Sequence, residues 1–154
     1  MEAGLPPGLI VTQTEPPQFA GQAEGWTILP NAQADSGLAS SLACAARHAR
    51  AERASALLVL LADMPLVPGR LLMELVETGA PAAAIHPDGR PGVPALLPAY
   101  LFERIASLEG DRGAASLLAT DPATQWLAAE PGWLLDVDTP DELAQAERIL
   151  RARA

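Results

Sequence analysis

The sequence predicts an α/β fold in three layers, with a mostly parallel mixed sheet between layers of helices. Three observations support this prediction. Residues 57–61 are apolar without a gap, which is typical of the central strand of a sheet that helices cover, buried on both faces. Segments with strand and helix patterns alternate along the chain with short connections. Residues 139–142 carry the clearest helix-start signal of the sequence.

The length and composition indicate one globular domain spanning residues 1–154. The chain is 49% hydrophobic and 19% charged, and no apolar run reaches the roughly 18 residues of a membrane span. Residues 1–8 lack the basic and apolar regions of a secretory signal, and Cys44 has no second cysteine as a partner. We therefore expect a cytoplasmic protein without a transmembrane helix.

The charge of the chain excludes one class of partner. The formal net charge is −9, whereas nucleic-acid binders usually carry a basic stripe. We therefore expect no nucleic-acid partner. All ten cationic side chains are arginines, so the chain contains no lysine.

Two short strands and an alanine-rich helix are predicted in the first third of the chain. Residues 8–12 and 26–30 are apolar and are separated by a stretch rich in Gly, Pro and Gln. A helix is expected from residue 35 or 36 to about residue 53. Its predicted buried face consists of Leu38, Leu42, Ala45 and Ala49.

The apolar strand at 57–61 leads to an acid, Asp63, at its carboxyl end. Ligands of open α/β sheets bind at this edge, so Asp63 is a candidate for chemistry. Pro68 suits the first position of a helix that ends at Gly79. The apolar stripe of this helix is Leu71, Leu72, Leu75 and Val76.

The second half of the chain begins with a predicted antiparallel hairpin. Residues 82–87 form one strand and residues 88–98 return, with the tightest turn at Asp88 and Gly89. Two short helices follow within residues 99–122, and residues 124–130 read as an outer strand.

The last predicted strand, residues 132–138, also ends on an acid. Asp138 closes it, and Asp136 lies two residues earlier on the same face. The helix that follows has Thr139 as N-cap, a proline at its first position and Glu142 to complete a capping box. Its expected buried face is Leu143, Ala146, Ile149 and Leu150.

Two acids at the carboxyl ends of two strands could converge on one hard divalent cation. Mg²⁺ favours one or two carboxylates together with water and substrate phosphates, so Asp63 and Asp138 would be sufficient. The alternative is that each acid only stabilises local structure. Asp63 could then accept hydrogen bonds from the turn before Pro65, and Asp138 could interact with the helix N-terminus behind it.

Five segments in order resemble the MobA-like NTP transferase family, within it the cytidylyl- and guanylyltransferases of molybdenum-cofactor assembly. Each segment is weak alone, whereas the order and spacing are fairly specific. The segments are NAQADSGLASSL (31–42), LLADMPLV (60–67), DGRPGVP (88–94), EGDRGAASLL (109–118) and LLDVDTPDEL (134–143).

The resemblance implies a Rossmann-like nucleotidyltransferase fold and a role for each segment. Asp63 would hold Mg²⁺, or Mn²⁺, against the α-phosphate of CTP or GTP, and Asp138 would share that metal or bind a second one. An acceptor phosphate, such as that of molybdopterin, would attack the α-phosphorus, and pyrophosphate would leave. The implied nucleotide-binding residues are Asn31, Gly37, Ser40 and Ser41, and the implied acceptor-binding residues are Gly92, Pro94 and Arg112.

The sequence departs from the family's pattern in three respects. The Gly-rich loop and the lysine that bind the triphosphate in the family are absent. Three explanations are open: the sequence is a fragment of an active enzyme, it is a short form that has lost catalysis, or another chain supplies the missing part. The family's first strand, beside the one ending at Asp63, is also missing, so strands should close up or a neighbouring molecule should fill the gap, with self-association. Val93 stands where the family's hairpin commonly has His or Asn, and His86 nearby is interpreted as a structural histidine.

Two other functions stay open at this point. One is a binding protein that keeps the fold without catalysis, and the other is an unrelated α/β domain whose acids are accidental. Exposed serines in the first turns of a helix are also common without any ligand, which applies to Ser40 and Ser41.

Overall fold

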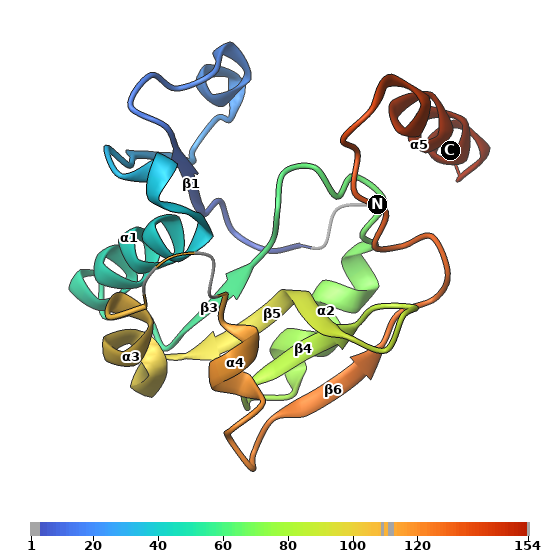
Figure 1. Cartoon of the computed structure of the whole chain (residues 1–154). Coiled ribbons are helices and arrows are strands. Elements are labelled where there is room, and N and C mark those ends of the chain that lie inside the picture. Colours follow the sequence, from blue (N-terminus) through green and yellow to red (C-terminus); the bar gives the residue numbers. More distant parts are fainter. Residues whose placement is uncertain (1–3, 109, 111–112, 154) are drawn as a thin grey trace. The chain divides into compact units, whose positions relative to one another are not determined.

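The computed structural model describes residues 4–108, 110 and 113–153 (Figure 1). The chain divides into two compact units. The C-terminal unit contains Met1–Gly4, Leu58–Leu96 and Ala123–Ala154, and the N-terminal unit contains Leu5–Leu57 and Leu97–Pro122. Helices alternate with parallel and antiparallel strands, so the predicted α/β class is confirmed. The single domain expected from the length stays a prediction.

The first two strands of the N-terminal unit form a small parallel sheet. β1 (Leu9–Thr12) pairs with β2 (Thr27–Pro30) in a register that starts at Leu9 opposite Thr27. A short 3₁₀ helix, η1 (Gln18–Gln22), lies in the connection. Both strands agree with the predicted segments 8–12 and 26–30, and each starts one residue later than predicted.

The helix α1 (Leu38–Ala51) follows a 3₁₀ turn, η2 (Ala34–Ser36). Its buried face differs from the predicted one, since Leu38 is 46% exposed and Ala45 is half-buried. The face that packs inward is lined by small side chains, which let the helix α3 (Phe102–Ala106) approach closely. The buried residues of α1 are Ala39, Leu42, Ala43, Ala46 and Ala49.

Two short helical segments complete the N-terminal unit, as predicted. The first consists of η3 (Ala99–Leu101) running into α3, and the second is α4 (Ala115–Leu118). Their apolar residues are buried and form much of the core of this unit: Leu101, Phe102, Ile105, Leu117 and Leu118.

A four-stranded sheet has the order β3-β5-β4-β6. β4 (Ala82–Ile85) pairs antiparallel with β5 (Pro91–Pro98) and parallel with β6 (Gln125–Ala128). The predicted hairpin and outer strand are therefore confirmed. The turn between β4 and β5 places Gly89 at a φ of 83°, a conformation that glycine adopts without strain.

The apolar strand β3 (Ala56–Val59) lies at an edge of this sheet, which corrects the predicted central position. All four of its residues are only half-buried, and Leu60 just beyond it is 42% exposed. No described strand is hydrogen-bonded to β3 on its side away from β5, and β1 and β2 pair only with each other. Within the four-stranded sheet, β3 thus has an apolar edge to which no described strand is hydrogen-bonded.

The helix α2 (Gly69–Glu77) begins one residue later than predicted, because Pro68 is its N-cap. Leu71 and Leu75 are fully buried, as the apolar stripe predicts. The helix ends before Gly79, whose φ of 59° suits a glycine after a helix.

The segment 132–138 is irregular, so the predicted last strand is wrong. Trp133 and Leu134 are buried within turns, and their burial, rather than a sheet, accounts for the apolar run.

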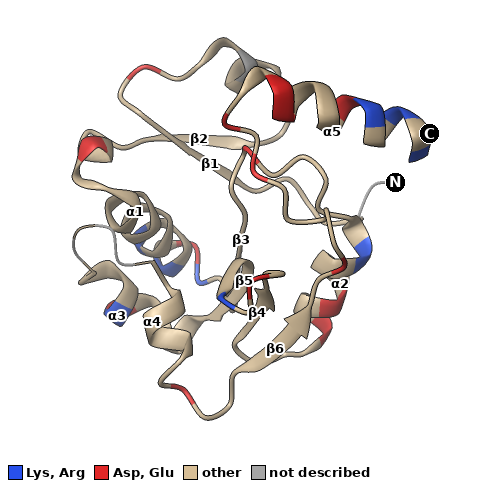
Figure 2. Ribbon diagram, turned by 45° about the vertical axis from the view of Figure 1, so that its right-hand side comes forward, with Lys and Arg blue, Asp and Glu red and all other residues tan. Residues whose placement is uncertain are grey.

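The last helix, α5 (Pro140–Arg153), begins where the capping signal places it. Its acidic first turn and basic last turn are both visible in Figure 2. Its predicted buried face is wrong, since only Ala146 is buried in the described part of α5, and Leu143 and Leu150 are 50% and 42% exposed. Within the described residues, no helix has the length and apolar character needed to cross a membrane.

Candidate active site

Asp63 lies in the turn after β3, with one side-chain oxygen inaccessible to solvent. This atom, Oδ1, has no hydrogen-bond partner among the described residues. A buried carboxylate oxygen without a donor lowers stability, and native proteins keep such groups where a ligand or cation supplies the missing partner. Asp63 is therefore the strongest single candidate in the C-terminal unit.

The irregular segment 136–138 runs beside Asp63. The backbone N–H of Val137 donates to the Asp63 carbonyl at 2.9 Å. This hydrogen bond places Asp136 and Asp138, the two neighbours of Val137, next to the turn that carries Asp63. The segment delivers its acids as the predicted strand would have done, although it is not a strand.

The capping box of α5 holds the end of this segment. Glu142 Oε2 accepts hydrogen bonds from the backbone N–H groups of Asp138 and Thr139 at 3.0 and 2.8 Å. The Thr139 hydroxyl in turn accepts from the N–H of Glu142 at 3.3 Å. The hydrogen bond from Thr139 and those from the backbone lower the pKa of Glu142, so this carboxylate stays charged.

Electrostatics shows that the three aspartates share one environment. Burial raises the pKa of Asp136 above its ordinary value of 3.8, and the negative charge of Asp63 raises it further. Asp138 also raises this pKa, whereas the charge of His86 lowers it. The Asp136 residue as a whole remains exposed, so a cation in solution can reach it.

The sequence interpretation chose Asp138 as the partner of Asp63 and gave no role to Asp136. The structure brings both residues next to Asp63. The negative charge of Asp63 raises the pKa of the Asp136 carboxyl group. Two acids spaced by one residue at the end of an apolar run were the available signal for Asp136.

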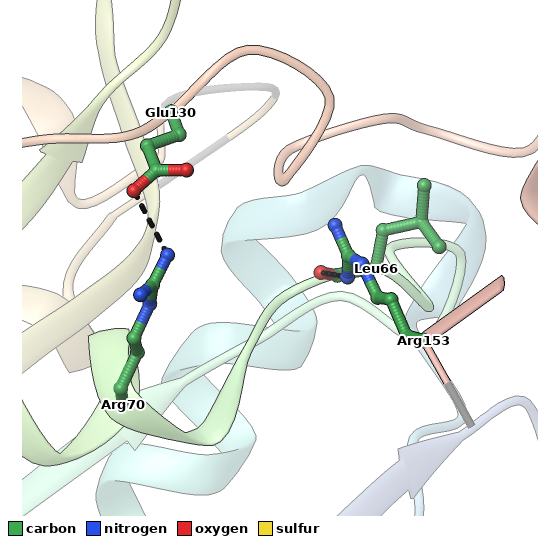
Figure 3. A network of polar contacts seen from close by, with 4 residues as sticks. All are labelled: Leu66, Arg70, Glu130 and Arg153. Atoms are coloured by element: carbon green, nitrogen blue, oxygen red, sulfur yellow. Dashed lines mark hydrogen bonds and ion pairs between the residues drawn. The ribbon is translucent and has the colours of Figure 1, made fainter. Parts of the chain in front are cut away.

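Polar contacts between residues far apart in the sequence connect the elements around the aspartates. Arg70 of α2 forms an ion pair with Glu130 at 2.8 Å (Figure 3). The Arg70 guanidinium also lies 4.2 Å from the centre of the Trp133 ring. Arg153 of α5 donates to the Leu66 carbonyl at 3.1 Å (Figure 3). The turn after Asp63, the segment before Asp136 and the helix after Asp138 are thus connected within one unit.

The acids fit a hard divalent cation. They offer carboxylate oxygens, and Asp63 Oδ1 lacks any other partner among the described residues. No three acidic, histidine or cysteine side chains of the described chain converge closely enough to enclose a metal ion by themselves. Mg²⁺ does not require such a cage, because it keeps several waters and binds one or two carboxylates plus substrate phosphates.

The predicted acceptor residues lie at the start of β5, in the same unit. Gly92 contacts the ring of His86, whose Nε2 is 3.1 Å from the Val93 carbonyl. Pro94 is fully buried, so it supports the strand and cannot itself contact a ligand from solution. Arg112 lies outside the described residues.

The predicted nucleotide residues meet one another in the N-terminal unit. The buried Asn31 donates from Nδ2 to the hydroxyls of Ser40 at 2.9 Å and Ser41 at 3.1 Å, and its Oδ1 accepts from the Gln33 N–H at 3.0 Å. The Ser40 hydroxyl lies 2.7 Å from the Gln33 carbonyl and 2.9 Å from the Gly37 carbonyl. Gly37 precedes α1 at a φ of 99°.

A hollow of about 270 Å³ opens beside this network. Ser40 is the one predicted nucleotide residue that lines it, and Arg47 adds a cation that has no ion pair among the described residues. Most of its lining is polar: Gln33, Ser36, Ser40, Arg47 and Ser107.

Known proteins match the chain at the level of family and fold. The family model of the MobA-like NTP transferase domain matches residues 2–127. A nucleotidyl transferase from Methanothermobacter thermautotroptrophicus superimposes with a TM-score of 0.72 and 19% identity, over 97% of this chain and 76% of that one. No curated protein matches the sequence.

Two mycobacterial structures are similar in the same way. The manganese complex of Rv0371C from Mycobacterium tuberculosis H37Rv has a TM-score of 0.67 and 22% identity, over 94% of this chain and 79% of that one. Its homolog from mycobacterium sp. strain JC1 has a TM-score of 0.68 and 20% identity, over 94% and 75% of the two chains. These likenesses confirm the Rossmann-like nucleotidyltransferase fold.

Proposed function

Because the chain belongs to the MobA-like NTP transferase family, we propose that it transfers a nucleoside monophosphate from an NTP to a phosphorylated acceptor. The family match supports nucleotidyl transfer in general. CMP as the transferred group and molybdopterin as the acceptor rest on the resemblance of the motifs. The observation that carries the proposal is the buried Oδ1 of Asp63, which has no hydrogen-bond partner in the described part of the chain and lies beside Asp136 and Asp138.

The proposed reaction exchanges one phosphoanhydride bond for another. An oxygen of the acceptor phosphate attacks the α-phosphorus, the bond to the β-phosphate oxygen breaks, and pyrophosphate leaves with that electron pair. A divalent cation, Mg²⁺ or Mn²⁺, would neutralise the phosphate charge during this step. Two of the three acids, Asp63 with either Asp136 or Asp138, would hold it together with water and substrate phosphates, and positioning by the chain supplies the rest.

The partners follow from this proposal. CTP or GTP and a phosphorylated small molecule are the substrates, with Asn31, Gly37, Ser40 and Ser41 as proposed nucleotide-binding residues and Gly92 and Arg112 on the proposed acceptor side. Pro94 takes part only by shaping the strand. The cytoplasmic location and the absence of a nucleic-acid partner remain predictions from the composition.

A pyrophosphate-release assay with CTP or GTP, the acceptor and Mg²⁺ tests the function. We expect Asp63→Asn and Asp136→Asn to lower turnover by about 100-fold or more, because the charge that holds the cation is lost. Asp141→Asn is the matched control, since this exposed acid of the first α5 turn makes no hydrogen bond or ion pair with the described residues of the site and should leave turnover unchanged. Wild-type rates in both Asp63→Asn and Asp136→Asn would overturn the proposal.

A second function is favoured by one observation, the complete absence of lysine for binding a triphosphate. The chain would then bind a nucleotide without transferring it. Saturable binding of Mg²⁺·CTP in calorimetry, with no release of pyrophosphate at any acceptor concentration, would establish this alternative.

We further propose that the chain self-associates through the open edge of β3. Proteins normally prevent the pairing of edge strands with charged side chains or proline. The edge strand from Ala56 to Leu61 is apolar and contains neither. An identical edge on a second copy offers matching N–H and C=O groups. In sedimentation experiments, the wild type should form dimers, and Leu60→Lys should abolish them. Leu143→Lys, at an exposed position outside β3, is the control and should keep the dimers. A monomeric wild type would contradict the proposal.

A further inference from the structure

The helix α5 buries little of its surface and makes polar contacts at both of its ends. Ala146 is the only buried residue in its described part, and the apolar Leu143 and Leu150 are 50% and 42% exposed. A helix with so small an apolar contact gains little stability from packing. The contacts of its first and last turns therefore matter for where the helix lies.

The first turn of α5 is connected to the turn of Asp63 through the segment 136–138. Oε2 of Glu142 accepts a hydrogen bond from the backbone N–H of Asp138 at 3.0 Å. The preceding residue, Val137, donates its own N–H to the Asp63 carbonyl at 2.9 Å. Two consecutive N–H groups thus link the start of the helix to the turn that carries Asp63.

The last turn of α5 contacts the chain shortly after Asp63. Nη1 of Arg153 donates to the carbonyl oxygen of Leu66 at 3.1 Å (Figure 3). Leu66 lies three residues beyond Asp63 and is 1% exposed, so its carbonyl belongs to a well-packed part of the unit. One helix therefore contacts both segments that carry the proposed metal ligands, the first with Glu142 and the second with Arg153.

We infer that α5 sets the separation between these two segments, with Glu142 and Arg153 as positioning residues of the proposed metal site. The inference rests on the proposed function, because the cation is the ligand whose site the helix would shape. Neither side chain has to touch the cation. Each acts through a backbone group next to an aspartate: the N–H of Asp138 for Glu142, and the carbonyl of Leu66 for Arg153.

Mn²⁺ binding, measured by electron paramagnetic resonance, tests the inference without turnover. Arg153→Ala should weaken the binding roughly 3- to 10-fold, the size expected for one lost hydrogen bond. This change also removes a positive charge, which by itself would strengthen the binding of a cation. Loss of affinity in Arg153→Ala would thus have the sign that positioning predicts and the opposite of the sign that charge predicts.

Arg151→Ala is the matched control. It removes the same charge from the same turn, but Arg151 pairs with Glu147 of the same helix at 3.2 Å. This variant should not weaken Mn²⁺ binding, because the contact between α5 and the Leu66 carbonyl is kept.

Two substitutions of Glu142 separate its position from its charge. Glu142→Ala should weaken Mn²⁺ binding roughly 3- to 10-fold. Glu142→Gln should keep most of the affinity, because glutamine also completes a capping box although it carries no charge. The double variant of Glu142→Ala and Arg153→Ala should bind little more weakly than either single variant, since α5 constrains the separation only while both ends are attached.

Hydrogen exchange of the Val137 N–H gives a second measurement that needs no metal. Exchange should be faster in Glu142→Ala and in Arg153→Ala than in the wild type. The backbone N–H of His86, which donates to the Arg90 carbonyl at 2.9 Å in the hairpin, should keep its rate and shows that the unit is still folded.

Unchanged Mn²⁺ affinity in Arg153→Ala, an equal loss in Arg151→Ala, or unchanged Val137 exchange in both alanine variants would overturn the inference. A failure of the proposed function looks different. The wild type would then bind no Mn²⁺ and release no pyrophosphate, while the exchange of the Val137 N–H would still respond to Glu142→Ala and Arg153→Ala.

Discussion

The two predicted sets of polar residues differ in what their atoms do in the folded chain. Asn31, Ser40 and Ser41 in the N-terminal unit are bonded to one another and to nearby backbone groups. Asp63 in the C-terminal unit has a buried oxygen to which no described residue donates a hydrogen bond, and its charge raises the pKa of Asp136. The first set already has its partners, whereas the second requires one from outside.

A buried polar residue can serve the fold or a ligand, and its hydrogen bonds distinguish the two roles. A buried amide that is fully hydrogen-bonded fixes a loop against a helix, and Asn31 does so between β2 and α1. An unsatisfied carboxylate reduces stability and is expected at functional sites, where a ligand removes the penalty. The carboxylates are therefore better evidence for chemistry than the serines.

The largest expected effect is a difference in the free energy of unfolding between Asn31→Ala and Asp63→Asn. Removing the Asn31 amide leaves the Gln33 N–H without its acceptor and the two serine hydroxyls without their donor, so the free energy of unfolding should fall by about 2 kcal/mol. Asp63→Asn in EDTA should change it by less than about 0.5 kcal/mol, because a repulsive charge is removed. Urea unfolding followed by circular dichroism measures both values.

A control on the same network is Ser41→Ala, which deletes one acceptor at the longer distance of 3.1 Å. It should cost about 0.5 to 1 kcal/mol, less than Asn31→Ala. If Asp63→Asn destabilised the chain as much as Asn31→Ala, the carboxylate would be a structural group and the contrast between the two sets would fail.

The sequence predicted those parts of the fold whose signals are local. The start of α5 follows from Thr139 and Glu142, which contact each other three residues apart, and the hairpin follows from the Asp88-Gly89 turn. The buried face of α1 did not follow from its pattern. It depends on which side α3 covers, and small alanines leave the period ambiguous.

The position of β3 in the sheet could not be predicted from its local sequence pattern. Its gapless apolar run predicted a central strand, yet the described chain provides no strand for its outer edge. Asp63 and Asp138 could be chosen as candidates from the sequence, because a strand end and a helix cap mark them. Asp136 was not chosen, because its electrostatic interaction with Asp63 joins residues that are far apart in the sequence.

The smallest expected effect is the pH dependence that Asp136 contributes. Its folded-state pKa is raised, first by burial and then by Asp63, above the value of 3.8 that it has when unfolded. Below that value it is protonated in both states, and its favourable contribution to stability relative to high pH is fully present. As the pH rises through the folded pKa, the charge forms beside Asp63 and this contribution to stability is lost.

Asp136→Asn should therefore raise the melting temperature relative to the wild type at pH 7 in EDTA, by roughly 1 to 2 °C, and the difference should vanish at pH 3. Saturating Mg²⁺ should reverse the order at pH 7, because a cation that binds only the folded wild type stabilises it and the variant has lost a ligand. Differential scanning calorimetry of both proteins at the two pH values, with and without Mg²⁺, measures these shifts. A melting difference that is equal at pH 3 and pH 7 would mean that Asp136 and Asp63 do not repel each other, and the carboxylate set would lose its electrostatic basis.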